Sequence, residues 1–207
     1  MPKILIQLAH PVLQYSLLNQ RMKKAVESMP SVTYNDLYEQ YPDFMIDVEH
    51  EQELLRQHDV IVLQHPFYWY SVPALMKEWM DLVLEHGFAY GKDGTALQGK
   101  VLLSAITTGG DESTYQHSTS IRDFLKPIEA TAGLCGMQYL APFVIHSSHK
   151  IKAGNFSEDL PEDVVERESA NYKLMVENLA SGEFDVEKAK QVQRINHPAA
   201  KLLGVGT

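Results

Sequence analysis

The stretch DVIVLQHPFYWYSVPA, residues 59–74, decides the fold. Its first six residues form a mainly aliphatic run that is too short for a typical helix, which predicts a strand buried on both faces of a sheet. Four consecutive aromatic residues, at positions 67–70, follow at once. Aromatic side chains normally lie inside a protein, and four in a row cannot all point in one direction. We expect strand-like alternation to bury two of them and to leave two exposed over a crevice.

Similar aliphatic runs occur on both sides of this strand. Residues 3–8 and 100–106 predict two more buried strands. Residues 137–146 predict another, interrupted by Pro142, and residues 31–37 alternate more weakly, as an edge strand does. The sequence therefore predicts five strands.

Amphipathic helical patterns separate these strands. Residues 18–29, 72–83 and 165–179 each carry one apolar stripe at helical spacing. Residues 121–133 are also helical in pattern but contain Pro127, which should kink the helix or mark a restart. Alternation of strands and helices predicts an α/β fold. We expect a three-layer sandwich with a five-stranded parallel sheet in the flavodoxin-like order 2-1-3-4-5.

Composition sets limits on the class of protein. The 207 residues suffice for one sizeable domain, which we assign to residues 1–182, with residues 183–207 as a peripheral C-terminal tail. A formal net charge of −9 argues against broad nucleic-acid binding, because phosphate repels such a surface. The single cysteine, Cys135, excludes an internal disulfide. The N-terminus does not resemble a signal peptide, and no apolar run approaches the roughly 20 residues of a transmembrane helix.

Ligands of such sheets bind beyond the carboxyl ends of the strands, where the chain order reverses. The first loop selected by this rule leads into a helix at Ser16, a good N-cap residue. Unpaired N–H groups at the helix start attract phosphate, and His10, Ser16 and Asn19 add donors. The alternative is that Ser16 merely caps the helix and His10 is a surface residue.

The other two selected loops are the aromatic row and the loop after the strand at residues 100–106. The latter reads Thr107, Thr108, Gly109, Gly110, in which the glycines permit close approach of a ligand to the backbone. The alternative for the aromatic row is core packing. The alternative for the Thr107–Gly110 loop is an ordinary turn. Together, the three loops describe a ligand with an anionic tail and a flat aromatic head. Flavin mononucleotide (FMN) has that shape.

Two other patterns in the sequence resemble known binding motifs but depart from them. GTALQGKV, residues 94–101, has the glycine spacing of a nucleotide phosphate loop, but it ends in Val101 and precedes a strand, so we do not predict a nucleotide triphosphate site. HSSH, residues 146–149, has no third ligand nearby, so no metal site is predicted.

At these residues the chain resembles the NAD(P)H:quinone oxidoreductase family of flavodoxin-like proteins, and most closely the ancillary flavoproteins of the glutathione-regulated potassium-efflux (Kef) system. The resemblance rests on AHP followed by Ser16 and Asn19, on LYEQYPDFMID at residues 37–47, and on QHPFYWYSVPALMKEWMDLVLEHGFAYG at residues 64–91. It continues through GTALQGK into TTGGDES.

The resemblance implies two groups of FMN-binding residues. The phosphate would be held by His10, Ser16, Leu17, Leu18 and Asn19. The ring would be contacted by Phe67, Tyr68, Trp69, Tyr70, Thr107, Thr108, Gly109 and Gly110. The chain lacks the long C-terminal region of the FAD-binding members, which favours FMN over FAD.

The resemblance also implies an activity and partners. It implies two-electron reduction of quinones by NADH or NADPH in homodimers whose active sites lie at the subunit interface. The efflux relatives bind a potassium/proton antiporter of the Kef type, so we expect a cytoplasmic protein held at the cytoplasmic face of the inner membrane through that partner. The alternative is a regulatory flavin-binding subunit with little or no reductase activity.

One departure from the family concerns proton movement. Larger quinone reductases often carry a Tyr and a His after TTGG; Tyr115 stands at the Tyr position, but the His position is Ile121, and His117 is out of register. Trp69, Tyr115 and His117 are the catalytic candidates, as side chains that line the open face of the ring.

Overall fold

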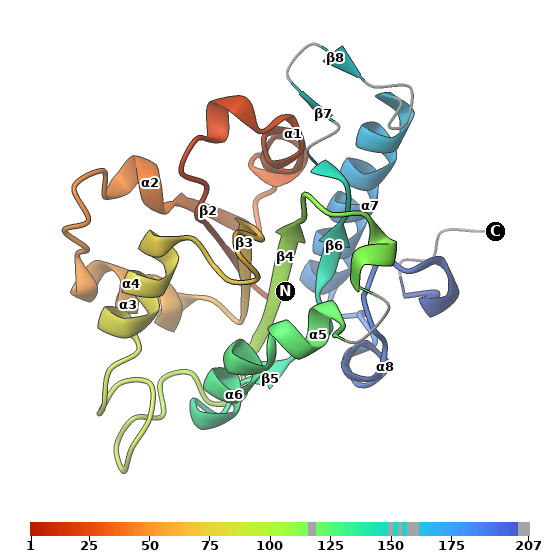
Figure 1. Cartoon of the computed structure of the whole chain (residues 1–207). Helices are drawn as coiled ribbons and strands as arrows, with labels where there is room; N and C mark the ends of the chain where they lie inside the picture. Colours follow the sequence, from red (N-terminus) through yellow and green to blue (C-terminus); the bar gives the residue numbers. More distant parts are fainter. Residues whose placement is uncertain (116–118, 149–150, 153–154, 157–161, 203–207) are drawn as a thin grey trace.

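The strand at the start of the deciding stretch lies in the middle of a parallel sheet (Figure 1). The computed structural model describes residues 1–115, 119–148, 151–152, 155–156 and 162–202. The sheet consists of β1 (Ile4–Leu8), β2 (Val32–Asp36), β3 (Val60–Pro66), β4 (Val101–Thr107), β5 (Gln138–Tyr139) and β6 (Phe143–Ile145). Its order is β2-β1-β3-β4-β5, with β6 also paired to β4, and every pairing is parallel. The predicted flavodoxin-like order is confirmed.

The predicted fifth strand is divided into two pieces. β5 pairs with the start of β4, and β6 pairs with its end. The break contains Pro142, which has no N–H group to donate to a neighbouring strand. One predicted strand therefore appears as two, and its second half still reaches the carboxyl edge of the sheet.

Helices cover both faces of the sheet, as Figure 1 shows. α1 (Leu17–Val26) and α7 (Glu162–Ser181) bury one apolar cluster; α3 (Val48–Gln57), α4 (Ala74–Val83) and α6 (Lys126–Leu134) bury the other. Because side chains alternate along a strand, Ile4 and Ile6 enter the first cluster and Leu5 the second. The three layers are as predicted.

Short elements complete the fold. They are the helices α2 (Leu37–Gln40), α5 (Ile121–Phe124) and α8 (Val186–Gln191), the 3₁₀ turns Leu13–Tyr15, Glu112–Tyr115 and Pro198–Ala200, and a hairpin of β7 (Ile151–Lys152) and β8 (Asn155–Phe156). α5 ends at Phe124, and α6 begins at Lys126 with Pro127 in its first turn, so the predicted restart is confirmed.

A buried carboxylate ties α3 to the sheet and to α4. Glu51 is fully buried and accepts hydrogen bonds from the side chains of Gln7, Asn35, Tyr41 and Trp79. All four donors are neutral, so hydrogen bonds compensate for the loss of water around the carboxylate.

The C-terminal segment packs against the edge of the sheet. Phe184, Ala189 and Ile195 are buried in the cluster beneath α7. The N–H of Ala141 donates to the carbonyl of Ala189 at 3.0 Å, and the N–H of Ile195 donates to the carbonyl of Pro142 at 2.9 Å. These contacts cover the break between β5 and β6. The division of the chain at residue 182 stays a prediction.

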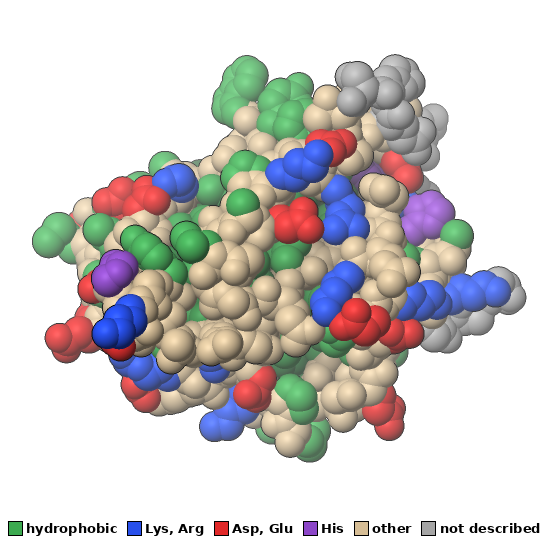
Figure 2. Space-filling view, turned by 90° about the horizontal axis from the view of Figure 1, so that it is seen from below, with side chains coloured by type: hydrophobic (Ala, Val, Ile, Leu, Met, Phe, Trp, Pro, Cys, Tyr) green, Lys and Arg blue, Asp and Glu red, His purple; other side chains and the backbone are tan. Residues whose placement is uncertain are grey.

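The outer surface is mixed in charge. Acidic and basic side chains are interspersed over the face that Figure 2 shows, which is the lower side of the molecule in Figure 1. Among the helices that the structure describes, none combines the length and the apolar character needed to cross a bilayer.

Candidate functional site

A cavity of about 660 Å³ lies at the carboxyl ends of β1, β3 and β4. Its lining comprises His10, Val12, Tyr15, Ser16, Leu17, Leu18, Pro66, Phe67, Tyr68, Trp69, Thr107, Gly109 and Ser148. All three loops selected from the sequence contribute to it. The volume lies in the range of cavities that hold a cofactor-sized ligand.

The start of α1 forms one end of this cavity. Ser16 occupies the N-cap position, as predicted, but among the described residues its side chain caps no backbone N–H. Instead, Ser16 Oγ accepts a hydrogen bond from Asn19 Nδ2 at 3.0 Å. The Ser16 hydroxyl proton is therefore available to a ligand. The N–H groups of the first helical turn are available as well, because they have no acceptor within the helix. The alternative that Ser16 merely caps the helix is wrong.

Asn19 lies beneath the cavity rather than in its lining. It is fully buried, and its Nδ2 also donates to Thr107 Oγ1 at 3.1 Å. Its Oδ1 accepts from Gln64 Nε2 at 3.1 Å, and Gln64 Oε1 in turn accepts from the hydroxyls of Tyr34 and Tyr172. This buried network fixes the helix start against the ends of β3 and β4.

His10 is a buried residue of the lining, so the alternative that it is a surface residue is wrong. Burial lowers the pKa of His10 to about 4, so the ring is neutral near pH 7. Its Nδ1 accepts a hydrogen bond from the N–H of Val12 at 3.2 Å. A neutral ring that accepts at Nδ1 carries its proton on Nε2. His10 thus offers a neutral N–H donor.

The aromatic row does not alternate as a strand does. Phe67 is buried, Tyr68 and Tyr70 are about half-exposed, and Trp69 is 93% exposed. The strand ends at Pro66, and the chain reverses in a tight turn in which the N–H of Ser71 donates to the carbonyl of Tyr68 at 3.0 Å. The expectation that two aromatics are buried is therefore wrong.

The turn has an unusual backbone. Trp69 and Tyr70 have φ values of 49° and 63°, in the left-handed region that bulky side chains rarely adopt. Tyr70 is held there by stacking on Phe124, with ring centroids 4.8 Å apart. Tyr70 thus lies outside the lining of the cavity, while Trp69 and Tyr68 stay beside it. Strain of this kind commonly marks a functional site.

The Thr107–Gly110 loop forms the opposite wall. Thr107 and Gly109 line the cavity, and a Cβ added to Gly109 would meet no described atom within 4 Å. A Cβ added to Gly110 would instead approach the Tyr115 hydroxyl to 3.1 Å. Thr108 turns away, because its hydroxyl donates to the carbonyl of Gly110 at 2.8 Å. Gly109 is thus the position of this loop that leaves room for a ligand beside the backbone.

Two of the three catalytic candidates have a defined position. Trp69 lines the cavity. Tyr115 lies behind Phe67, with ring centroids 6.2 Å apart, and lines a second cavity instead. Ile121 is buried, and His117 lies outside the described residues.

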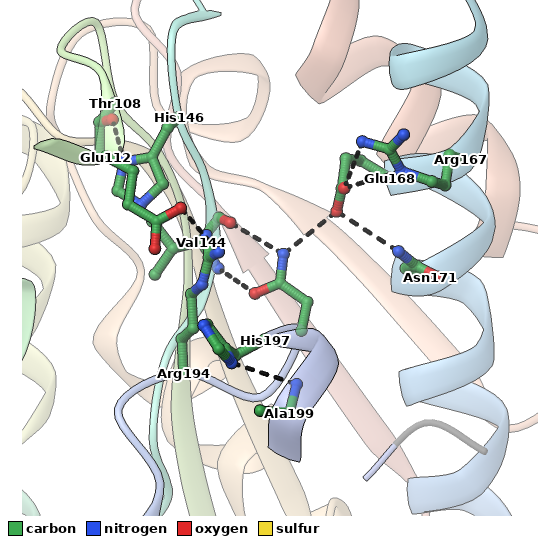
Figure 3. Close-up of polar contacts among 11 residues, drawn as sticks. Thr108, Glu112, Val144, His146, Arg167, Glu168, Asn171, Arg194, His197 and Ala199 are labelled. Carbon is green, nitrogen blue, oxygen red and sulfur yellow. Dashed lines mark hydrogen bonds and ion pairs between the residues drawn. The ribbon is translucent and has the colours of Figure 1, made fainter. Parts of the chain in front are cut away.

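His146 is a residue that sequence reasoning did not select. Its ring lies 5.6 Å from that of Tyr115, and its Nδ1 is 3.1 Å from Thr108 Oγ1 (Figure 3). The Thr108 hydroxyl proton goes to Gly110, so the His146 Nδ1–H is the donor in this contact. Burial, and then the charge of Arg194, lower the pKa of His146 to about 4, so this ring is also neutral.

Four lining residues were missed: Val12, Tyr15, Pro66 and Ser148. The first three belong to loops that had been selected. Ser148 follows β6, and the rule that selected the other loops applies equally to the end of that strand.

The residues present fit a flavin mononucleotide. Hydroxyl, imidazole and helix N–H donors line the cavity, as a phosphate requires. The Tyr68 and Trp69 side chains and the space beside Gly109 belong to the same cavity, as a flat ring requires, and the Tyr68 ring lies 6.1 Å from that of His10.

Comparisons with known proteins agree with this fit. A family described as having a flavodoxin-like fold matches residues 2–166. The glutathione-regulated potassium-efflux system ancillary protein KefG of Enterobacter sp. (strain 638) is 49% identical over 148 residues, which cover 70% of this chain and 81% of that protein.

Two solved structures are similar over most of the chain. The general stress protein 14 of Treponema denticola, in complex with FMN, has a TM-score of 0.76 at 34% identity, covering 86% of this chain and 99% of that one. An NADPH-quinone reductase from P. pentosaceus has a TM-score of 0.72 at 34% identity, covering 84% and 96%.

Proposed function

The chain belongs to the family of proteins with a flavodoxin-like fold, and from that premise we propose that it is an FMN-dependent NAD(P)H:quinone oxidoreductase. We further propose that it serves as an ancillary subunit of a glutathione-gated potassium/proton antiporter. The first proposal is supported by relatives of known structure that bind FMN or are named quinone reductases, and the second by the KefG relatives.

One observation supports the choice of cofactor: the uncapped start of α1 lines the same cavity as Gly109, where an added Cβ would meet no described atom within 4 Å. In this proposal Ser16 Oγ–H, the N–H groups of Leu17 and Leu18 and the His10 Nε2–H hold the phosphate. FMN, which lacks the adenosine of FAD, needs one anion-binding end, and the start of α1 offers one.

A bound flavin would supply the redox chemistry, by accepting hydride from NAD(P)H and passing two electrons to a quinone. The chain supplies position. Tyr68 and Trp69 flank the open side of the cavity, where nicotinamide and quinone would stack in turn. The buried imidazole of His10, neutral at pH 7, donates a hydrogen bond without adding a full charge.

We propose that a second copy of the chain covers the mouth of the cavity. Val12, Tyr15, Tyr68 and Trp69 are exposed, apolar or aromatic, and line one cavity. Exposed aromatics clustered in this way are typical of interfaces. Sedimentation velocity tests this: a dimer in the wild type that Trp69→Ala shifts toward monomer supports the interface, and a monomeric wild type excludes it.

The ancillary role places the protein in the cytoplasm, at the cytoplasmic face of the inner membrane through its antiporter. A regulatory flavin-binding subunit with little reductase activity is the second candidate. It is favoured by the position of Tyr115, which packs behind Phe67 and lines the second cavity.

Two experiments separate these roles. Purified protein should be yellow and release FMN on denaturation, and the flavin-loaded protein should turn over NADPH with a benzoquinone. Bound FMN without turnover would leave only the regulatory role; no bound flavin would refute both. Potassium efflux in cells with and without the chain tests the antiporter role, and a variant that lacks reductase activity but stays dimeric shows whether efflux needs turnover.

A further inference from the structure

The loop that follows β4 stands between two cavities. Thr107 and Gly109 line the candidate flavin cavity. Glu112 and Tyr115, a few residues further on, line a second cavity of about 510 Å³ with a separate set of residues. Residues 107–115 thus form a wall between the two cavities. Tyr115 packs this wall against the apolar cluster on one side of the sheet, and polar side chains line its other side in the second cavity.

One polar contact joins this wall to the C-terminal segment. Arg194 Nη2 donates to Glu112 Oε2 at 3.0 Å, as Figure 3 shows. The Arg194 side chain is 17% exposed and the Glu112 side chain 43%, so this ion pair is partly shielded from solvent. The same guanidinium acts electrostatically on His146, whose ring donates to Thr108 in the wall.

The residues next to Arg194 are firmly anchored. Asn196 Oδ1 accepts from the N–H of Val144 at 3.1 Å, and Asn196 Nδ2 donates to the Val144 carbonyl at 2.8 Å. The same Nδ2 is 3.1 Å from Glu168 Oε2 on α7 (Figure 3). The Asn196 side chain therefore pairs with β6 much as a neighbouring strand would, and links β6 to α7.

The segment is also held before Arg194. Arg122 Nη1 donates to the carbonyls of Lys190 and Val192 at 2.8 and 2.9 Å. The stretch from 190 to 196 is therefore tied down at both ends, and Arg194 projects from a rigid base.

We infer that residues 190–197 form a strut that holds the wall of the flavin cavity, with Arg194 as a positioning residue that acts through Glu112. The inference rests on the proposed function only where it calls the cavity a flavin site. Residues 190–197 lie beyond the region 2–166 that matches the family. The strut therefore adds to the matched region a contact that the family match does not describe.

Hydrogen exchange of the full-length protein without flavin tests the strut directly. Within the wall, the N–H of Thr108 bonds to the Ile145 carbonyl, and that of Thr114 bonds to the Asp111 carbonyl. In Arg194→Gln, peptides that cover Thr108 and Thr114 should exchange at least about fivefold faster, while peptides of β1 keep their rates. The dissociation constant for FMN should rise at least about fivefold, with an altered visible circular dichroism of the bound flavin.

Further variants separate positioning from general damage. Glu112→Gln should reproduce the faster exchange and weaker FMN binding of Arg194→Gln, and the double variant should show no larger change than either single variant. Arg194→Lys, which keeps the charge, should show a smaller change than Arg194→Gln. Arg56→Gln is the matched control, because Arg56 pairs with Glu53 on the exposed side of α3, and it should change neither readout.

Unchanged exchange in the wall in both Arg194→Gln and Glu112→Gln would overturn the strut. Faster exchange spread evenly over β1 and the wall would also overturn it, because that pattern reports lower global stability. If Arg194→Gln does not fold, Glu112→Gln carries the test. If the wild type binds no FMN, the proposed function fails, and the exchange measurement still decides the strut.

Discussion

Asn19 Nδ2 donates a hydrogen bond to Thr107 Oγ1 at 3.1 Å, and so joins the start of α1 to the end of β4 across 88 positions of the chain. The same amide group donates to Ser16 and accepts from Gln64 at the end of β3. One buried side chain thus fixes the donor-rich end of the candidate site relative to its glycine wall.

Replacement of Asn19 by alanine should weaken both folding and flavin binding. The substitution leaves Gln64 Nε2 with fewer acceptors in a buried position, which costs about 1–3 kcal/mol of unfolding free energy. Ser16 and Thr107 lose their common anchor, so we expect the FMN dissociation constant to rise by about tenfold or more. Urea unfolding and flavin fluorescence titration measure the two effects.

An exposed amide provides the control for this variant. Gln57 donates to Glu53 on the surface of α3, so Gln57→Ala should leave FMN binding unchanged and stability within about 0.5 kcal/mol. Tight FMN binding in a folded Asn19→Ala protein would show that the start of α1 does not depend on this network.

Gly109→Val should block the cavity without damaging the fold. Gly109 does not require a positive φ, and a Cβ there projects into open space, so the chain tolerates a side chain. That space belongs to the proposed ring site, and we expect FMN affinity to fall at least about tenfold while the melting temperature of the flavin-free protein changes little.

Gly133→Val is the matched substitution for Gly109→Val. Gly133 is exposed on α6, and a Cβ there also meets no described atom within 4 Å. FMN affinity should be the same as in the wild type. Equal affinities in the two valine variants would place the ring elsewhere.

The sheet and the location of the site were predictable because each depends on local pattern. The aliphatic runs at residues 3–8, 59–64 and 100–106 are long enough for buried strands and too short for helices. Once their order is assumed, the loops at their carboxyl ends follow from topology alone. This is why the aromatic row and the Thr107–Gly110 loop were correctly associated with one cavity.

The internal arrangement of the site was not predictable, because it depends on contacts between distant residues. Nothing near Trp69 and Tyr70 indicates positive φ values; glycine or asparagine is the usual signal, and here the ring of Phe124 stabilises the turn. Asn19 looked like a phosphate donor, yet Thr107 and Gln64 hold it below the cavity. His146 lies beside Tyr115 from another strand end.

Glu51→Gln should destabilise the protein strongly although it preserves shape. The carboxylate accepts from four donors, and a glutamine amide replaces one of its oxygens with a donor. Two buried donors then face an N–H₂ group, which costs on the order of 3 kcal/mol. The loss appears in urea unfolding followed by tryptophan fluorescence, because Trp79 Nε1 is one of the four donors.

A glutamate on the exposed side of α3 provides the control for Glu51→Gln. Glu53 is half-exposed and pairs with Arg56, so Glu53→Gln should cost no more than about 0.5 kcal/mol. A similar loss in the two variants would mean that the Glu51 network contributes nothing beyond a surface carboxylate.

Acid should destabilise the fold well before the carboxylates titrate, because buried histidines must gain protons. Burial lowers the pKa of His65 to about 4, against 6.5 for the exposed side chain, and His10 and His146 are lowered similarly. Between pH 4 and pH 6.5 the unfolded chain binds more protons than the folded chain. The unfolding free energy is therefore highest above pH 6.5 and falls as the pH is lowered toward 4. Each histidine contributes a slope of up to about 1.4 kcal/mol per pH unit.

His65→Asn isolates one of these contributions. His65 Nδ1 donates to the carbonyl of Pro66 at 2.9 Å, and an asparagine amide can take that role without gaining a proton. His65 Nε2 is buried and has no partner among the described residues, so a proton added there finds no acceptor among them. Urea unfolding at several pH values between 6.5 and 5 should give a shallower slope for His65→Asn than for the wild type. A flat wild-type profile over this interval would mean that these rings take up protons without loss of the fold.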